Sequence, residues 1–330
     1  MNKYRLISIL IGLLTTSTTL FAQDKFILTV SQDGKGDFST IQQAIDASKA
    51  FPDQRVTIYV KNGTYREKVR VPSCNSQLSI IGESVDRTIL TFNDYFNRMG
   101  KGRNSTFFTG TLTVEANDFV MENITVENFS GPVGQAVALH VEGDRCLFVN
   151  CRFLGSQDTL YAAGRFSRQY FFRCYVEGTT DFIFGEATAL FEKCEIHCKA
   201  DSYITAASTP EGKPFGFVFL ECKINAASGV SKVFLGRPWR SFAKVAYLNC
   251  EMGSFIRPDG WDNWSKTENE QTAQFAEYGN KGDGSKLEGR VGWSKKLSEK
   301  QAAAFTKEQI FVSLGWELPM KKIWYKTDIQ

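Results

Sequence analysis

Asn150-Cys151-Arg152-Phe153 is the clearest copy of a four-residue pattern that returns along the middle of the chain. Each copy reads polar, small apolar, polar, large apolar, which is the alternation of a strand with one buried face. The other copies are Asn123-Ile124-Thr125-Val126, Arg173-Cys174-Tyr175-Val176, Lys193-Cys194-Glu195-Ile196, Glu221-Cys222-Lys223-Ile224 and Asn249-Cys250-Glu251-Met252. Their second positions lie 20 to 28 residues apart, which fits one coil of a solenoid.

The irregular length of these coils argues against helical-pair repeats, whose periods are stricter. Strands of about four residues joined by Gly-rich turns fit a parallel β-helix instead, so the sequence predicts an all-β, single-stranded solenoid with its cysteines stacked inward. A solenoid needs a cap at each end. Ser39-Thr40-Ile41-Gln42 predicts a short helix over the N-terminal end, and Ser298 with Gln301 predicts a second one, running to Phe305, near the other terminus.

Most of the eight cysteines are expected to be small buried hydrophobes rather than disulfide partners. Cys194 and Cys198 are close in sequence, and Cys74 and Cys146 lie outside the repeated four-residue pattern. These four are therefore the better candidates for a disulfide bridge. Their connectivity is left open.

The N-terminus has the features of a secretory signal peptide. Lys3 and Arg5 precede the apolar run 6–14, and Ala22 stands before a change to polar sequence. We expect cleavage after Ala22, with residues 23–330 forming one solenoid domain that is secreted or periplasmic and monomeric. The apolar run is too short to cross a bilayer and no later segment reaches the ~20 residues required, so no membrane span is predicted.

Composition excludes several classes of function. The whole chain carries +3, of which Lys3 and Arg5 account for two, so the remainder lacks the basic excess of a nucleic-acid binder. Only two histidines occur, His140 and His197, neither with an acidic or serine partner at useful spacing, and we interpret both as structural. The Gly-x-Ser-x-Gly elbow of a serine esterase and the paired C-x-x-C of a zinc site are both absent. No metal or cofactor is predicted.

Two aspartates hold the same position on successive coils. Asp158 lies seven residues after Cys151, and Asp181 lies seven residues after Cys174. Stacked coils would bring them within about 4.8 Å, the spacing of neighbouring strands. Two carboxyl groups this close in a partly desolvated groove cannot both ionise cheaply, so one should keep its proton and act as an acid while the other acts as a nucleophile. A lone Asp in a Gly-rich loop is more often a turn residue, and only the pairing favours catalysis.

Three further side chains support this hypothesis. Arg237 is always charged and would hold one of the carboxylates ionised. Gln135 and Gln157 offer amide N–H donors for a developing oxyanion, although Gln135 alone fits a structural amide ladder equally well. Trp239, Tyr161 and Phe184 could supply flat faces for a sugar ring, against the alternatives that Trp239 covers the side of the solenoid and that the other two fill the core.

At these residues the chain resembles the pectin methylesterases, carbohydrate esterases of the pectinesterase family, and in particular the shorter secreted bacterial kind. The resemblance runs from Asp33-Gly34 and Gly36-Asp37-Phe38 through Gly63-Thr64-Tyr65-Arg66-Glu67, Gly134-Gln135-Ala136-Val137-Ala138-Leu139, Gln157-Asp158-Thr159-Leu160-Tyr161, Asp181-Phe182-Ile183-Phe184-Gly185 and Leu235-Gly236-Arg237-Pro238-Trp239 to Gly260-Trp261 and Glu277-Tyr278. It implies a right-handed parallel β-helix that hydrolyses the methyl esters of galacturonate units in homogalacturonan, without metal, releasing methanol.

The resemblance also implies a role for each candidate residue. Asp181 corresponds to the nucleophile, Asp158 to the general acid and base, and Arg237 to the residue that positions the nucleophile. Gln157 and Gln135 belong to the oxyanion region. The sugar-binding groove corresponds to Trp239, Tyr161 and Phe184.

Other polysaccharide-active solenoids fit less well. A pectate lyase would need a cluster of acidic calcium ligands, and a polygalacturonase would resemble its family through an Asp-Asp pair and a Gly-His-Gly; neither signature occurs here. From a different class, the alternative is a non-catalytic β-solenoid that binds plant polysaccharide or serves as an adhesin. Methanol release from methylated pectin separates that alternative from an esterase.

Overall fold

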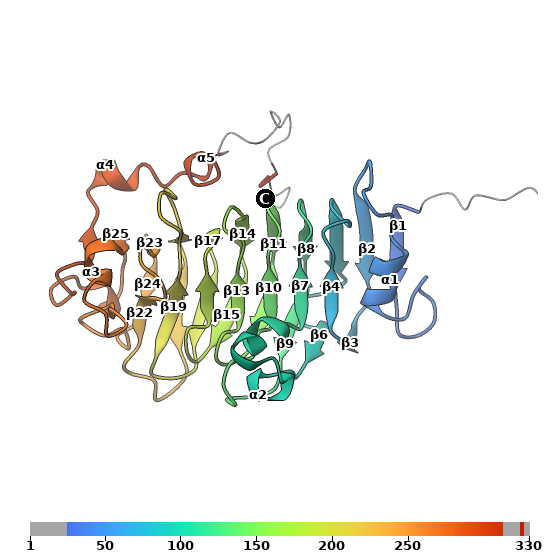
Figure 1. The fold of residues 1–330 in the computed structure, drawn as a ribbon, viewed down its shortest axis with the longest axis horizontal. Helices are drawn as coiled ribbons and strands as arrows, with labels where there is room; N and C mark the ends of the chain where they lie inside the picture. Colours follow the sequence, from blue (N-terminus) through green and yellow to red (C-terminus); the bar gives the residue numbers. More distant parts are fainter. Residues whose placement is uncertain (1–24, 313–323, 327–330) are drawn as a thin grey trace, which may run out of the picture.

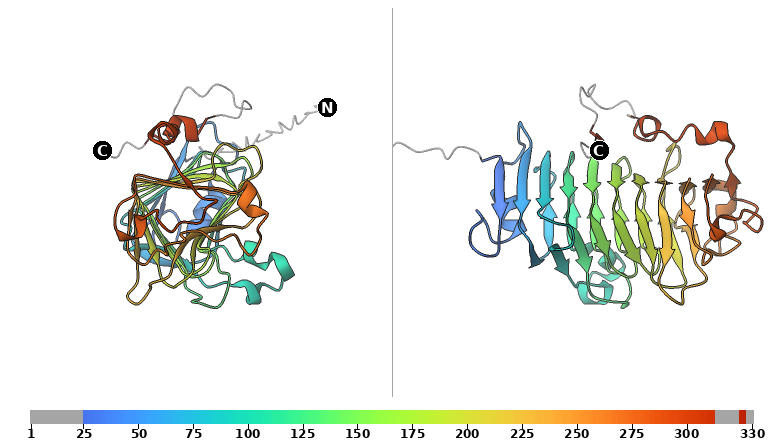
Figure 2. Two further views of the ribbon diagram at one scale, coloured as in Figure 1. Left: turned by 90° about the vertical axis from the view of Figure 1, so that its left-hand side faces the viewer. Right: turned by 180° about the vertical axis from the view of Figure 1, so that it is seen from behind.

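The computed structural model describes residues 25–312 and 324–326. Their strands wind into a right-handed parallel β-helix, as the sequence predicts, and each central coil contributes one strand to each of three parallel sheets (Figures 1 and 2). The predicted signal peptide, residues 1–22, lies outside the described residues. No helix in the described part of the chain has the length and apolar character needed to cross a membrane.

Sheet A forms one wall, with the strand order β1 (Ile27–Val30), β2 (Val56–Val60), β5 (Leu78–Gly82), β8 (Val120–Glu122), β11 (Cys146–Val149), β14 (Arg168–Phe172), β17 (Thr188–Glu192), β20 (Phe217–Leu220), β23 (Lys244–Leu248), β25 (Gln274–Tyr278) and β26 (Lys295–Lys296). Sheet B runs β3 (Gly63–Arg66), β6 (Thr88–Phe92), β9 (Thr125–Asn128), β12 (Arg152–Leu154), β15 (Tyr175–Gly178), β18 (Glu195–Cys198), β21 (Lys223–Ala226) and β24 (Glu251–Met252). Sheet C runs β4 (Val69–Val71), β7 (Leu112–Val114), β10 (Leu139–Val141), β13 (Leu160–Ala162), β16 (Ile183–Gly185), β19 (Tyr203–Ala207) and β22 (Phe234–Pro238).

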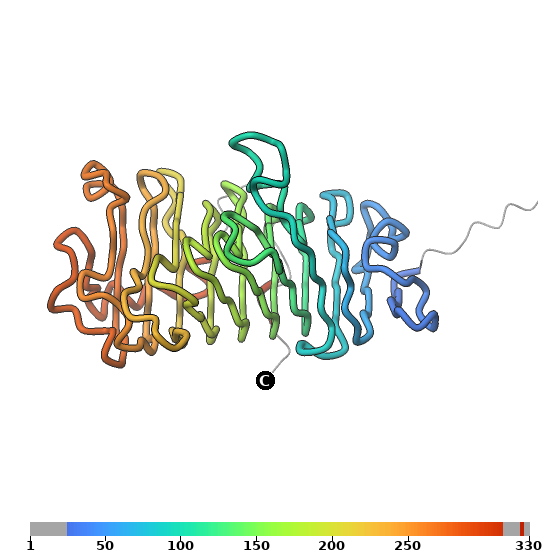
Figure 3. Tube along the Cα trace, turned by 90° about the horizontal axis from the view of Figure 1, so that it is seen from below, coloured from blue at the N-terminus to red at the C-terminus, as the bar shows by residue number. Residues whose placement is uncertain are grey.

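The helices are short and lie outside these walls. They are α1 (Ile41–Ala47), α2 (Phe96–Met99), α3 (Asn269–Thr272), α4 (Glu299–Ala302) and α5 (Lys307–Ile310), with 3₁₀ turns η1 (Gly102–Phe108) and η2 (Asp283–Ser285). The segment carrying α2 and η1 separates β6 from β7 and projects from the corner between sheets B and C (Figure 3).

The repeated pattern marks the corner between sheets A and B, and one detail of its interpretation is wrong. The strands of sheet B begin at its third position, because the first residue of every copy adopts the left-handed conformation that turns the chain. Asn150, for example, has φ 49°, and its amide donates to the Oδ1 of Asn123 on the preceding coil at 2.7 Å. The second position points inward as predicted: Cys151 and Cys174 are at most 2% exposed.

All eight cysteines are free, so neither candidate bridge forms. The buried thiols donate instead to backbone carbonyl groups; the Sγ of Cys151 lies 3.3 Å from the carbonyl oxygen of Val149 and 3.5 Å from that of Met121. Behind them, sheet A carries an inward stack of aromatic rings, in which Phe148, Phe171 and Phe191 follow one another at 4.7 and 4.6 Å. Much of the phenylalanine content therefore fills the core.

The two predicted helices differ in their position. Helix α1 closes the N-terminal end, where the side chains of Ile41 and Ile45 join the core. Helix α4 begins at Ser298 with the predicted capping box, but α4 and α5 run back along the outer face of sheet A (Figures 1 and 2). Their apolar side chains pack there because the strands of sheet A, such as β14 and β17, are buried on both faces. The C-terminal end of the core is instead covered by Val291 and Trp293.

Candidate active site

Asp158 and Asp181 lie on neighbouring coils at the corner between sheets B and C. Strands β13 and β16 pair with Leu160 opposite Ile183, so each aspartate stands two residues before the same point of its strand. The backbone N–H of Asp158 donates to the carbonyl of Thr180 at 3.1 Å, which ties the two coils together. Their φ angles of 64° and 49° are left-handed, a region that Asp tolerates better than most residues. The structure therefore brings the two predicted carboxyl groups side by side.

Both carboxyl groups are buried, but their surroundings shift their pKa values by different amounts. Burial and the neighbouring charge of Asp181 raise the pKa of Asp158 well above its usual range, against a smaller opposing effect of Arg237. Burial also raises the pKa of Asp181, and Asp262 adds to the rise, but the hydrogen bonds and charge of Arg237 oppose it. Arg237 therefore favours the ionised form of Asp181, as expected, but burial outweighs this effect and the pKa of Asp181 stays above its ordinary value. Asp158 therefore has the higher pKa of the two and is the carboxyl group that keeps its proton.

Arg237 binds Asp181 in a bidentate pair. It projects from β22, with Nε 2.9 Å from Oδ1 and Nη2 2.6 Å from Oδ2 of the aspartate, the geometry in which a guanidinium recognises a carboxylate most strongly. Its cationic plane lies between two aromatic rings, 3.9 Å from the centroid of Tyr203 and 3.7 Å from that of Trp264. The arginine is thus held in one orientation from both sides.

Sequence reasoning missed Tyr203 and Trp264. Trp264 reaches Arg237 from the loop after Trp261, where two consecutive residues, Trp264 and Ser265, have left-handed φ angles of 62° and 53°. The Oδ1 of Asp262 accepts the backbone N–H of Trp264 at 2.7 Å and so fixes this turn. An Asp two residues before an aromatic side chain is the only local sign of such a turn.

Aromatic side chains form a patch on sheet C beside the two aspartates. Tyr161 stacks on Phe184 at 4.5 Å, and Phe184 meets the edge of Trp239 at 6.0 Å. Phe184 is only 4% exposed, so contrary to expectation it offers little face to a sugar and instead supports its two neighbours, which remain half-buried. Phe107, which sequence reasoning also missed, extends the patch from η1 and lies 5.2 Å from Tyr161.

The two glutamines lie along the same corner: Gln157 directly precedes Asp158 on its coil, and Gln135 lies on the coil before it. Gln135 and Gln157 face each other across a parallel β-bridge, and the N–H of Ala136 donates to the carbonyl of Gln157 at 3.1 Å. Within residues 25–312 and 324–326, neither side-chain amide is hydrogen-bonded to another protein group, so they do not form a ladder with each other. Both amides are half-buried, and their donors are available to a ligand.

The histidines are hydrogen-bonded to groups other than the two aspartates and Arg237, but His140, contrary to expectation, has an acidic partner. His140 Nε2 lies 2.8 Å from a carboxylate oxygen of Glu142, and its ring packs against Tyr161 at 4.7 Å. His197 Nδ1 lies 2.7 Å from the amide oxygen of Asn225 on sheet B. Among the described residues, no group of three or more His, Cys, Asp or Glu side chains is placed to hold a metal ion.

Comparisons with known proteins agree on one family. The sequence matches the family described as Pectinesterase over residues 27–313. Pectinesterase 31 from Arabidopsis thaliana is 43% identical over 288 residues, which cover 84% of this chain and 90% of that protein. Among solved structures, the pectin methylesterase from carrot superposes with a TM-score of 0.80 at 30% identity, covering 86% of this chain and 92% of the other. The pectin methylesterase PemA from Erwinia chrysanthemi superposes with a TM-score of 0.75 at 27% identity, covering 89% and 98%.

Proposed function

The chain belongs to the pectinesterase family and hydrolyses the methyl esters of pectin, and we propose that Asp181 is its nucleophile and Asp158 its general acid and base. One observation carries the proposal: two adjacent buried carboxyl groups, of which Asp181 alone is clasped by a guanidinium. That asymmetry favours an ionised Asp181 next to a protonated Asp158. Nothing in the comparisons supports a non-catalytic solenoid.

The reaction then runs in two steps. The carboxylate of Asp181 attacks the ester carbonyl, and the C–O bond to methoxide breaks as Asp158 gives its proton to the departing oxygen, so that methanol leaves and an anhydride links Asp181 to the galacturonate. Asp158 is now a carboxylate and removes a proton from water as the water attacks the galacturonate carbonyl. The second step releases a galacturonate carboxyl group and restores both aspartates to their initial states.

Gln157 and Gln135 stabilise the oxyanion of both tetrahedral intermediates in this proposal. Their position supports this role, because Gln157 directly precedes Asp158, Gln135 lies on the preceding coil, and neither amide has a protein partner among the described residues. Tyr161 and Trp239 bind the sugar ring through their half-buried faces, with Phe184 behind them. The substrate is methyl-esterified homogalacturonan.

Replacing Gln157 by alanine should lower kcat for methanol release by about 10²–10³-fold with little change in KM, because an oxyanion donor acts on the transition state. Gln135→Ala should show the same kind of loss. Steady-state kinetics on methylated pectin measure both, with Gln32→Ala, at the far end of the solenoid, as a matched control. A rise in KM at unchanged kcat would show instead that the glutamines bind the ground state.

Asp158→Asn should slow methanol release and yet raise the melting temperature at neutral pH. The pKa of Asp158 is raised in the folded protein, so ionising this group costs stability. Below the ordinary value of 3.8 both folded and unfolded chains are protonated and the variant gains nothing. As the pH rises from there through the raised pKa, the wild type loses stability relative to the variant.

Thermal melts of both proteins between about pH 3 and pH 8 measure this difference, at roughly 2–4 °C for each kcal/mol relieved. A variant that melts below the wild type at neutral pH would contradict the assignment of a strained, destabilising carboxyl group at position 158.

We further propose that residues 1–22 direct export and are removed after Ala22, so that the enzyme acts in the periplasm or outside the cell as a monomer. The basic residues Lys3 and Arg5 before a short apolar run support export. N-terminal sequencing of the mature protein should begin at Gln23, and light scattering should give the mass of one chain. An intact Met1 would contradict export by this signal.

A further inference from the structure

A cavity of about 250 Å³ lies away from the aspartates. It is lined at the corner where the strands of sheet C pass into sheet A, by residues that follow β13, β16 and β19, among them Phe166, Arg168 and Lys213. The aspartates lie at the opposite edge of sheet C, before the same strands. Because these central strands are three to five residues long, about 10–16 Å separates the two edges.

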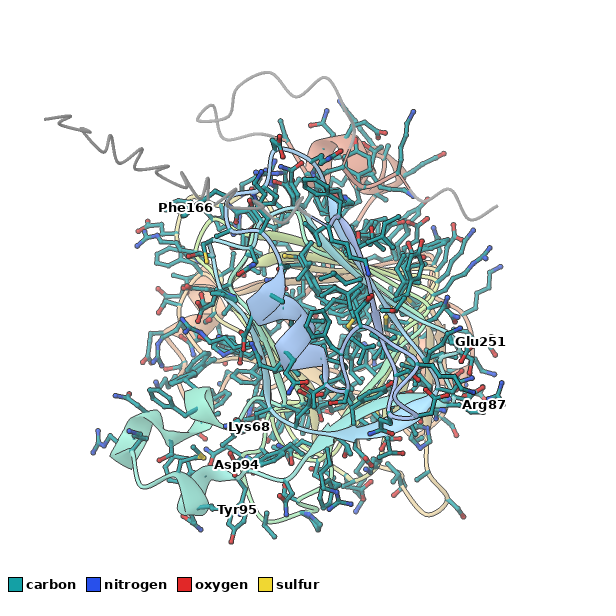
Figure 4. All side chains as sticks on the ribbon, turned by 90° about the vertical axis from the view of Figure 1, so that its right-hand side faces the viewer. Lys68, Arg87, Asp94, Tyr95, Phe166 and Glu251 are labelled. Carbon is teal, nitrogen blue, oxygen red and sulfur yellow. The ribbon has the colours of Figure 1, made fainter. Side chains whose placement is uncertain are left out.

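The cavity opens to solvent. Phe166 is 53% exposed and Val312 is 48% exposed, while Lys213 at the interior is only 6% exposed. Looking along the solenoid, Figure 4 labels Phe166 at the outer rim of one corner of sheet C, and Tyr95, next to the α2 segment, at the other corner. We call this cavity the Lys213 pocket.

The arginines around the Lys213 pocket have aspartate partners, whereas Lys213 has none in the described part of the chain. Arg168 binds Asp144 through Nε at 3.0 Å and Nη2 at 2.7 Å. Arg145 contacts the same carboxylate and also binds Asp118 through two hydrogen bonds of 2.7 and 2.8 Å. Further out, Glu186 and Arg165 act on Lys213 with opposite signs. Lys213 itself has no carboxylate partner among residues 25–312 and 324–326.

Lys213 differs from three less buried lysines, each of which has a carboxylate partner. Lys68, Lys199 and Lys307 each lie 2.8 Å from a carboxylate oxygen although about a third of each side chain is exposed. Lys213 is far more buried, and in the described part of the chain its Nζ makes one hydrogen bond, at 3.3 Å, to the carbonyl oxygen of Glu186. An ammonium group has three donors, and burying it without an anionic partner is costly.

The walls of the pocket match a sugar acid. Pro214, Ile310 and Val312 give apolar surface, and the hydroxyl groups of Ser167 and Thr188, which donate to backbone carbonyls, can still accept hydrogen bonds. The volume is just below the usual range for small-molecule sites, which suits a single ring. A carboxylate on that ring would supply the missing anion.

We propose that the Lys213 pocket is a second binding site, separate from the two catalytic aspartates, that takes the carboxylate of a uronic acid, with the galacturonate units produced by this enzyme as its ligand. The identity of the ligand depends on the proposed function, the demethylation of pectin. The existence of the site depends only on the geometry of the pocket. The carboxylate accepts hydrogen bonds from the two remaining donors of Lys213. The site would hold the enzyme on stretches that it has already demethylated.

Burial lowers the pKa of Lys213 to about 8, so the amine is partly neutral at that pH. A carboxylate bound beside it would raise this pKa, and binding at pH 8 must therefore take up protons. A lysine with a purely structural role has no such linkage to a uronate.

The test is calorimetric titration of D-galacturonate into the wild type, Lys213→Met, Trp239→Ala and the matched control Lys199→Met. The wild type, Trp239→Ala and Lys199→Met should bind, with proton uptake at pH 8 that falls at pH 6.5, measured in two buffers of different ionisation enthalpy. Lys213→Met should bind at least about tenfold more weakly, as expected for loss of a charge-assisted hydrogen bond, and without proton uptake. Its kcat for methanol release should be unchanged, which separates this site from the catalytic aspartates.

Galactose, acetate and sulfate at equal ionic strength define the ligand chemistry. Galactose should not bind, and acetate and sulfate should bind more weakly than galacturonate. Wild-type affinity in Lys213→Met, or equal binding of sulfate and galacturonate, would overturn the proposal. Circular dichroism confirms the fold of each variant, and removal of a buried, uncompensated charge is expected to raise rather than lower the melting temperature of Lys213→Met.

Discussion

Asp181→Asn should lower kcat for methanol release from methylated pectin by at least about 10⁴-fold, the scale on which enzymes lose activity with their nucleophile. An amide cannot form the anhydride, and the donors, aromatic patch and Asp158 that remain do not replace a covalent step. Asparagine tolerates the left-handed φ of 49° at this position, so the backbone need not move.

The loss must be separated from unfolding, because the change leaves the half-buried Arg237 without its carboxylate. Circular dichroism and thermal melts should show a folded variant, and binding of a demethylated oligogalacturonide should persist. Asp86→Asn, an exposed aspartate on the sheet B side that pairs with Arg152, is the matched control and should keep full activity. Residual turnover within tenfold of the wild type would refute Asp181 as nucleophile.

Arg237→Met should lower kcat by about 10²–10³-fold, comparable to removal of one preorganised electrostatic partner in an active site. Burial already raises the pKa of Asp181, and Arg237 is the group that limits the rise. Without the guanidinium that pKa rises further, so the acid limb of the kcat/KM profile should move to higher pH. Part of the lost activity should return as the pH is raised.

Arg257→Met provides the matched control for Arg237. Arg257 binds Asp259 with two hydrogen bonds of 2.9 Å and lies 4.5 Å from the ring of Phe234, so it repeats the local chemistry outside the catalytic pair. Its loss should leave the pH profile unchanged. If Arg237→Met retained near-normal activity, or if its acid limb moved to lower pH, another group would have to keep Asp181 ionised.

Much of the fold was predictable because a solenoid is nearly one-dimensional: a fixed offset within a coil becomes a fixed position in space. The seven-residue offset from Cys151 and Cys174 therefore placed Asp158 and Asp181 on neighbouring coils without any knowledge of the loops. The sequence did not predict that the first residue of each copy of the four-residue pattern turns the chain rather than beginning a strand. Asn favours the left-handed turn, but Glu221 at that position gives no such signal.

The surroundings of Arg237 could not be predicted in this way. Trp264 reaches the guanidinium from a loop that follows β24 and folds back over sheet C, and Phe107 comes from η1, the insertion before β7. Neither segment belongs to the repeat, so no offset places it. The position of α5 could not be predicted for a different reason. Its apolar contacts lie on the outer face of sheet A, around Leu190. A strand that is buried on both faces lacks the alternation of polar and apolar residues that would indicate which face is covered.

The central claim is that the two neighbouring carboxyl groups share one proton unequally, and carbon-13 NMR of the side-chain carboxyl carbons of aspartate-labelled protein tests it most directly. Asp158→Asn and Asp181→Asn assign the two signals. At a pH at which the enzyme releases methanol, the Asp158 carbon should resonate as a protonated acid and the Asp181 carbon as a carboxylate. Two ionised carboxylates, or a proton on Asp181 in place of Asp158, would contradict the account.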